Sequence, residues 1–120
     1  MPSLVSMAEP VGALLKERGQ TVAVSESAAG GLICAALLSV PGASNYFRGG
    51  ASVYTQTARR SLLRFDDTQA QMRGSTEEYA TLVATTMRGL METDWAIGES
   101  GAAGPSGNRY GDPAGHVALA

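Results

Sequence analysis

The sequence of 120 residues contains little cysteine, lysine and histidine, with one residue of each. The single cysteine, Cys34, excludes an intramolecular disulfide and a zinc site built from several cysteines, which favours a reducing compartment. The only histidine, His116, has no cysteine or second histidine near it, so we expect no metal site. The formal net charge is −2 and charges of both signs are scattered. No basic stripe results, and we expect no nucleic-acid partner.

A targeting signal and a long apolar run are also absent from the sequence. Its start, MPSLVSMAEPVGALLKERG, has no basic leading region, and Glu9 and Pro10 interrupt its apolar residues. Neither a signal peptide nor a membrane span fits this pattern, so we expect a cytoplasmic protein with no membrane partner.

The chain does have enough apolar residues, 44% of the total, to bury a core. Its length predicts a single domain over residues 1–120. Helices separated by strands predict an α/β fold, a three-layer α/β/α sandwich with a mainly parallel or mixed sheet. We expect helices at residues 4–18, 32–40, 57–63 and 75–90, strands at 21–24, 45–55, 95–98 and from 116 onward, and a long loop at 101–115.

Local signals set the ends of these elements. Gly19 stops the first helix, which Pro10 can split. The glycines 49 and 50 predict that residues 45–55 form a bent strand or a pair of strands with a bulge. Asp66 and Asp67 end the third helix, and Ser75, three residues before Glu78, is the expected N-cap of the fourth.

The segment TVAVSESAAGG at residues 21–31 is a strand, a turn and the start of a helix. Such a junction leaves backbone N–H groups unpaired, so it can stabilise an anion or an oxyanion. Gly30 and Gly31 let a ligand approach the backbone, and Glu26 either binds a ribose hydroxyl or favours the helix dipole. Ser27 either belongs to a pocket or only caps the helix.

A second loop follows the strand that ends near residue 98. Ligands sit at the carboxyl ends of parallel strands, so this loop and residues 25–31 can share one edge of the sheet. Its many glycines offer backbone N–H donors that suit phosphate or carboxylate, although the loop can also have a purely structural role. The candidate substrate-binding residues here are Glu99, Ser100, Gly101, Gly104 and Asn108.

Three motifs in the same order, SESAAGG, VPGASNYFRGGASVYT and ESGAAGPSGNRYGDPAGHVALA, resemble the C-terminal domain of the CinA (competence/damage-inducible) family. The likeness covers nearly the whole chain from about Thr21. Characterised members of that family hydrolyse the amide of nicotinamide mononucleotide to nicotinic acid mononucleotide and ammonia, without a metal or cofactor. The family domain continues through a further strand and a closing helix, so we expect this domain to be incomplete after Ala120.

The resemblance also implies site residues. The SES motif supplies Ser27, the PGAS motif supplies Ser44, and the VYT motif supplies Tyr54. The lysine that the family places five positions after this tyrosine falls on Arg59. In the implied mechanism Ser44 is the nucleophile, and Ser27 orients or stabilises the oxyanion. Tyr54 and Arg59 complete the network of protons and charges. All four must then converge in one cleft. From the residues alone, Ser44 reads as a turn residue and Tyr54 as a packing residue.

Two departures from the family pattern bear on catalysis. Arginine stays protonated and cannot act as the base. Arg59 can still orient a hydroxyl, hold the substrate phosphate or stabilise an oxyanion, and Tyr54, Glu26, His116 or water would then be the base. Ala28 and Ala29 stand where the family has Cys-Thr. The alternative function is a non-catalytic nucleotide-binding module, and a structural or oligomerisation domain is a third. The expected partners are a small-molecule nucleotide and further copies of the chain.

Overall fold

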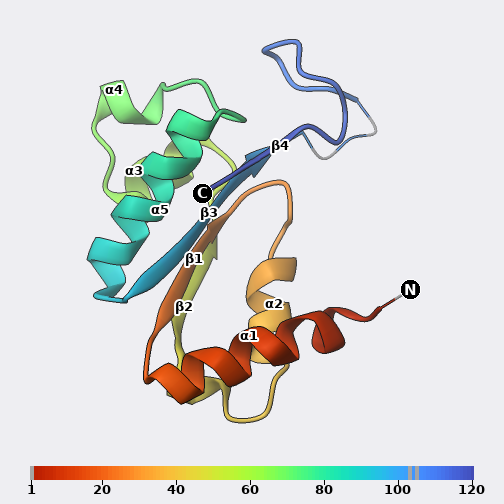
Figure 1. The fold of residues 1–120 in the computed structure, drawn as a ribbon. Helices are drawn as coiled ribbons and strands as arrows, with labels where there is room; N and C mark the ends of the chain where they lie inside the picture. Colours follow the sequence, from red (N-terminus) through yellow and green to blue (C-terminus); the bar gives the residue numbers. More distant parts are fainter. Residues whose placement is uncertain (1, 103, 105) are drawn as a thin grey trace.

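The computed structural model describes residues 2–102, 104 and 106–120, which form the predicted three-layer α/β/α sandwich (Figure 1). Its central sheet has the strand order β2-β1-β3-β4. Three strands are parallel, β1 (Val22–Glu26), β2 (Phe47–Ser52) and β3 (Trp95–Gly101), whereas β4 (Val117–Leu119) pairs with β3 antiparallel. The parallel strands therefore all end at the same edge of the sheet.

Two helices, α1 (Leu4–Arg18) and α2 (Leu32–Leu38), cover one face of the sheet. The helices α3 (Gln56–Leu63), α4 (Asp67–Ala70) and α5 (Glu77–Met91) cover the other. A hydrophobic core lies on each face of the sheet, and alternate residues of β1 point into one or the other. Val22 and Val24 pack with α1 and α2, while Ala23 packs beneath α5. This period of two is what a strand covered on both faces requires.

Helix α1 is continuous, so Pro10 does not split it. Ser3 caps its start by accepting a hydrogen bond from the Ser6 N–H, and Gly19 ends it with φ of 61°. Pro10 is exposed, as is Ser6 four residues earlier. Water can therefore reach the carbonyl that lacks its helical donor, which limits the cost of the proline.

Several predicted element ends differ from the structure. Strand β1 runs two residues beyond Val24, because Ser25 and Glu26 still pair with β2. The pairing of β1 with β2 skips Arg48, one residue before the predicted glycines. Asp66 does not end a helix but caps the start of α4 with Gln69.

The N-cap of α5 is Thr76 rather than Ser75. Thr76 accepts a hydrogen bond from the Tyr79 N–H, whereas Ser75 has a left-handed backbone with φ of 59°. A capping residue needs an extended backbone, which Ser75 therefore does not have. No helix within the described residues is long and apolar enough to span a bilayer.

Gly98 lets β3 lie directly against α5. A Cβ at this position would lie 2.2 Å from the Ala80 carbonyl oxygen and 2.9 Å from the Ala84 nitrogen. We therefore expect Gly98→Ala to lower the free energy of unfolding by about 1–3 kcal/mol, the usual cost of overpacking. Urea denaturation measures this change.

The control is Gly89→Ala on α5, where a Cβ meets nothing within 4 Å. A helix-interior glycine costs roughly 0.5–1 kcal/mol relative to alanine, so this variant should be more stable than the parent. Equal effects of the two substitutions would contradict the close packing of β3 on α5.

Candidate active site

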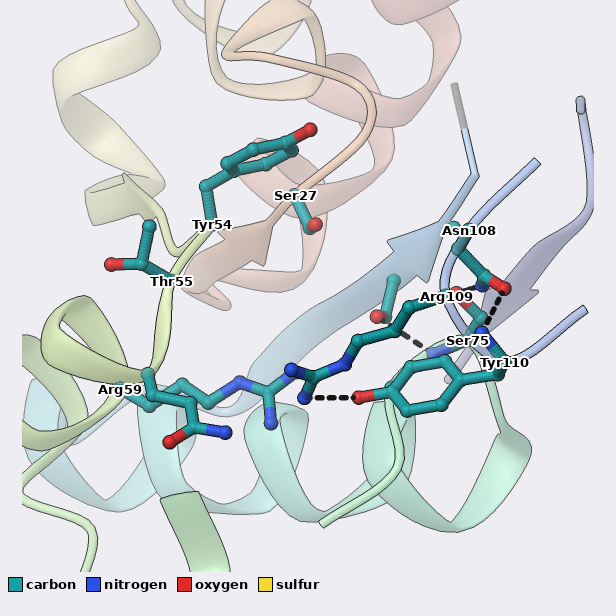
Figure 2. Close-up of a pocket in the computed structure, with 12 residues that line it drawn as sticks. Ser27, Tyr54, Thr55, Arg59, Ser75, Asn108, Arg109 and Tyr110 are labelled. Atoms are coloured by element: carbon teal, nitrogen blue, oxygen red, sulfur yellow. Dashed lines mark hydrogen bonds between the residues drawn. The ribbon is translucent and has the colours of Figure 1, made fainter. Parts of the chain in front are cut away.

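A pocket of about 460 Å³ opens at the carboxyl edge of the parallel strands (Figure 2). It contains residues from the ends of β1 and β3, from the start of α3, and from the loops before α5 and β4. No Asp, Glu, Lys or His is among the described residues that line it. The lining residues are Ser27, Tyr54, Thr55, Gln56, Arg59, Gly74, Ser75, Ser100, Gly101, Asn108, Arg109 and Tyr110.

Three of the four catalytic residues implied by the resemblance line this pocket. Ser27 follows the end of β1 and is half-buried. Tyr54 follows β2 and is 74% exposed, so it stands at the rim and is not a packing residue. Arg59, in α3, is only 9% exposed.

Ser44, the fourth, lies outside the pocket. It belongs to the short 3₁₀ helix η1 (Ala43–Asn45), which precedes β2, whereas Tyr54 follows the same strand. Six strand residues span about 20 Å, so Ser44 lies at the opposite edge of the sheet. It is exposed there, and its carbonyl accepts a hydrogen bond from Arg48. The prediction that Ser27 and Ser44 converge is therefore wrong.

Arg59 braces one wall of the pocket. Its Nη1 donates to the carbonyl oxygens of Ala70 (2.9 Å) and Met72 (2.8 Å). Its guanidinium carbon lies 4.2 Å from the centre of the Tyr79 ring, in cation–π distance. These contacts fix the side chain and hold the segment after α4 in place.

Glu99 occupies the anion site that the sequence predicts at the turn after β1. Its carboxylate accepts hydrogen bonds from three successive backbone N–H groups, those of Ser27 (3.2 Å), Ala28 (3.1 Å) and Ala29 (2.6 Å). Glu99 is buried and is absent from the pocket lining. In this structure these donors hold the protein's own carboxylate.

Glu26 accepts hydrogen bonds from the neighbouring N–H groups at the start of α2. Its carboxylate accepts from the N–H groups of Gly31 (3.0 Å), Ile33 (3.0 Å) and Cys34 (2.9 Å). Burial alone would raise the pKa of Glu26, but hydrogen bonds from the Cys34 thiol and from these N–H groups hold that pKa below its ordinary value. Of the two roles weighed for Glu26, this geometry matches the helix-dipole role.

The Cys34 thiol lies against the same carboxylate. Burial, followed by the hydrogen bond to Glu26 and the charge of Glu26, raises the pKa of Cys34 to about 12. The thiol is therefore protonated at neutral pH and unreactive.

The other predicted binding residues divide into two groups. Ser100, Gly101 and Asn108 line the pocket, whereas Gly30, Gly31 and Gly104 are not among its lining residues. Both Gly30 and Gly31 have positive φ, at 64° and 100°, so they shape the turn into α2.

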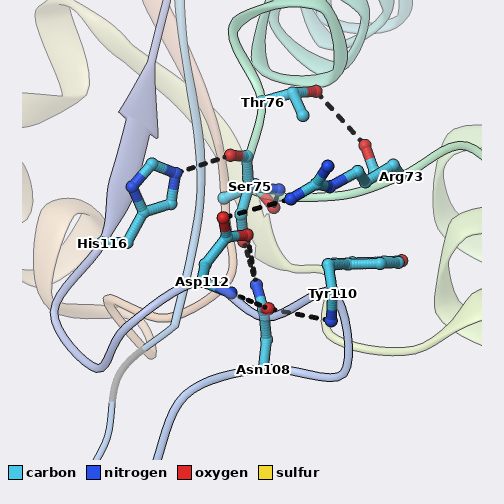
Figure 3. Close-up of polar contacts among 8 residues, drawn as sticks. Arg73, Ser75, Thr76, Asn108, Tyr110, Asp112 and His116 are labelled. Atoms are coloured by element: carbon cyan, nitrogen blue, oxygen red, sulfur yellow. Dashed lines mark hydrogen bonds and ion pairs between the residues drawn. The ribbon is translucent and has the colours of Figure 1, made fainter.

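Ser75 also lines the pocket, although its place in the sequence predicts only a helix cap. Its strained left-handed backbone is held on three sides (Figure 3). The N–H donates to Ser100 Oγ (2.9 Å), the hydroxyl accepts from Asn108 Nδ2 (3.1 Å), and the carbonyl lies 2.8 Å from His116 Nε2. Such strain clusters at functional sites. His116 is engaged here and does not line the pocket.

Asn108 and Asp112 fold the loop before β4 over this wall. Asn108 Oδ1 accepts from the N–H groups of Tyr110 and Asp112, and Asp112 pairs with Arg73 at 3.1 Å (Figure 3). The hydrogen bond from Asn108 and the charge of Arg73 hold the pKa of Asp112 below its ordinary value, although burial acts in the opposite direction.

Tyr110 is a second lining residue that the sequence gives no reason to select. Burial would raise its pKa, but the hydrogen bond from Arg109, the Gly74 N–H, and the charges of Arg109 and Arg59 lower it overall. The Arg109 Nη2 lies 2.9 Å from the phenol oxygen.

Comparison with known proteins identifies relatives of this chain. Residues 4–120 match the family described as the CinA C-terminal domain. The chain is 41% identical over 113 residues to a CinA-like protein of Synechocystis sp., covering 93% of this chain and 27% of that protein. It is 37% identical over 112 residues to a CinA-like protein of Sulfurihydrogenibium sp., covering 92% of this chain and 28% of that protein. The chain thus spans less than a third of these curated relatives.

Solved structures share the fold. A CinA superfamily protein from Klebsiella pneumoniae superposes with a TM-score of 0.88 at 29% identity, covering 97% of this chain and 73% of that one. The competence/damage-inducible protein CihA from Agrobacterium tumefaciens gives a TM-score of 0.87 at 27% identity, covering 99% of this chain and 73% of that one.

The lowered pKa of Glu26 makes a prediction about acid stability. Its charged form is favoured in the fold, so its contribution is fully present above its ordinary pKa of 4.5 and is lost as pH falls through the lower folded value. We expect Glu26→Gln to be less stable than the parent at pH 7, with the difference narrowing below pH 4.5. Urea denaturation at several pH values measures this.

The control is Glu9→Gln on the exposed face of α1, which should change stability little at any pH. A difference for Glu26→Gln that stays constant from neutral to strongly acidic pH would contradict the role of its charge.

Proposed function

Because the chain belongs to the CinA C-terminal domain family, we propose that its pocket binds a nicotinamide-type mononucleotide and hydrolyses the carboxamide to a carboxylate and ammonia. The observation that carries this proposal is the meeting of Ser27, Tyr54 and Arg59 in one pocket whose described lining has no acidic side chain. An anionic substrate suits such a pocket.

Ser27 is the proposed nucleophile. Its Oγ attacks the amide carbon, its proton goes to the departing nitrogen, and ammonia leaves. Water then cleaves the acyl ester, releases the carboxylate and restores the hydroxyl. The Ser27 N–H is already held by Glu99, so the turn keeps the residue in place but does not offer this donor to an oxyanion.

The described lining of the pocket has no strong base beside Ser27 to accept its proton. Both oxygens of Glu26 accept backbone N–H groups, and His116 Nε2 lies against the Ser75 carbonyl. Tyr54 at the rim or a water molecule then takes the proton. Neither is as strong a base as a lysine with a lowered pKa, so slow turnover is expected.

A second candidate is nucleotide binding without chemistry. Arg59 favours it, because its Nη1 is committed to two carbonyls and an arginine has no lone pair to accept the serine proton. If this residue silences hydrolysis, Arg59→Lys raises the turnover of the protein above that of the parent.

Ammonia release from nicotinamide mononucleotide by the full-length protein tests the proposal. Removal of a nucleophile should slow turnover by at least about 100-fold, so Ser27→Ala should lose nearly all activity. Ser44→Ala should keep it, because that hydroxyl lies at the far edge of the sheet.

Two outcomes would decide against the proposal. Turnover that survives Ser27→Ala but not Ser44→Ala places the nucleophile outside this pocket. Binding of the mononucleotide in calorimetry, with no ammonia released at high protein concentration, selects the second candidate.

A further inference from the structure

Positive charge gathers at one end of the pocket, around the Tyr110 ring. The guanidinium carbons of Arg109 and Arg73 lie 5.0 Å and 5.3 Å from the centre of this ring. The charge of Arg59 acts on the same phenol. Figure 2 shows the side chains of Arg59 and Arg109 pointing toward one another, away from Ser27 and Tyr54. The chain as a whole has a net charge of −2, so this concentration of positive charge is local.

Only one of these three arginines is neutralised by a carboxylate in the part of the chain that the structure describes. Arg73 pairs with Asp112, whereas no ion pair there involves Arg59 or Arg109. Like charges that converge at a partly buried site repel one another, and a bound anion removes that cost. The pocket lining supplies no carboxylate of its own that could do so.

Because Gly74 has no side chain, three pocket groups lie close to its backbone. A Cβ on Gly74 would lie 3.0 Å from Arg59 Nη2, 3.2 Å from Ser100 Oγ and 3.8 Å from the Tyr110 ring. Because Nη1 of Arg59 takes both carbonyls, Nη2 is the nitrogen that faces Gly74. A guanidinium edge, a hydroxyl and a phenol thus gather at the Gly74 backbone, where a methyl group would be a tight fit.

We propose that Arg59 and Arg109 form a phosphate-binding subsite in the pocket, with the backbone of Gly74 beside Arg59 as its floor. This subsite rests on the proposed function for the rest of the ligand: the phosphate monoester of the mononucleotide binds the arginines, and the carboxamide extends toward Ser27. Arginine suits this role because its planar group donates two parallel hydrogen bonds to phosphate oxygens. The residue in place of the family lysine is therefore an anchor for the substrate and not a base.

Calorimetry on the full-length protein tests the subsite with nicotinamide mononucleotide and with its nucleoside, which lacks only the phosphate. Hydrogen bonds to charged groups predict that the mononucleotide binds about 10- to 100-fold more tightly. Inorganic phosphate should compete with the mononucleotide and not with the nucleoside. Arg109→Gln should remove most of the preference, and the exposed position of Arg109 lets this variant fold.

Arg60→Gln is the matched control, since it removes the same charge from an exposed residue of α3 that does not line the pocket. Gly74→Ala is a second variant that changes no charge but places a methyl group against Arg59 Nη2. It should also weaken binding of the mononucleotide and leave binding of the nucleoside nearly unchanged.

Equal affinity for the mononucleotide and the nucleoside, or equal effects of Arg109→Gln and Arg60→Gln, would overturn the subsite. The proposed hydrolysis fails separately: a phosphate preference without ammonia release keeps the subsite and removes the amidase activity. Ammonia release without a phosphate preference keeps the amidase activity and removes the subsite.

Discussion

Two buried carboxylates, Glu26 and Glu99, hold the backbone N–H groups of the junction between β1 and α2. Between them they accept hydrogen bonds from residues 27, 28, 29, 31, 33 and 34. A carboxylate is costly to bury without partners, and unpaired N–H groups are costly too, so each set of groups satisfies the other. Glu99 also ties the turn after β1 to β3, the neighbouring strand. The position of Ser27 in the pocket depends on this arrangement.

This arrangement decides where the pocket can recognise an anion. In many α/β proteins the start of the helix after the first strand binds phosphate directly. Here the protein's own carboxylates take those donors, and the free positive charge lies across the pocket on Arg59 and Arg109. Arg59 has two roles in this scheme, because it braces the segment after α4 with Nη1 and faces the pocket with Nη2. An arginine at this position thus suits binding better than proton transfer.

The sequence predicts the layers of the fold well because its signals are local. Helix periodicity, Gly19 at the end of α1 and the strand character of residues 22–24 each depend on a few neighbouring residues. The N-cap of α5 is wrong by one residue, because the left-handed backbone of Ser75 is imposed by contacts with Ser100, Asn108 and His116, which lie far along the chain.

The site is less predictable than the fold, because it depends on contacts between residues that lie far apart in the sequence. Three residues selected from the family motifs, Ser27, Tyr54 and Arg59, line one pocket, but the motifs give no distances. The predicted second strand, residues 45–55, already separates Ser44, which precedes it, from Tyr54, which lies near its end. Nothing in the sequence indicates that the Glu99 carboxylate reaches back to the turn after β1, or that Arg109 and Tyr110 return from a glycine-rich loop to line the pocket.

The most direct test of this account is a crystal structure of the protein with nicotinamide mononucleotide bound. We predict phosphate oxygens within hydrogen-bond distance of Arg59 and Arg109, with the Glu99 carboxylate still on the N–H groups of residues 27–29. A phosphate bound to those N–H groups, with Glu99 displaced from them, would contradict the account.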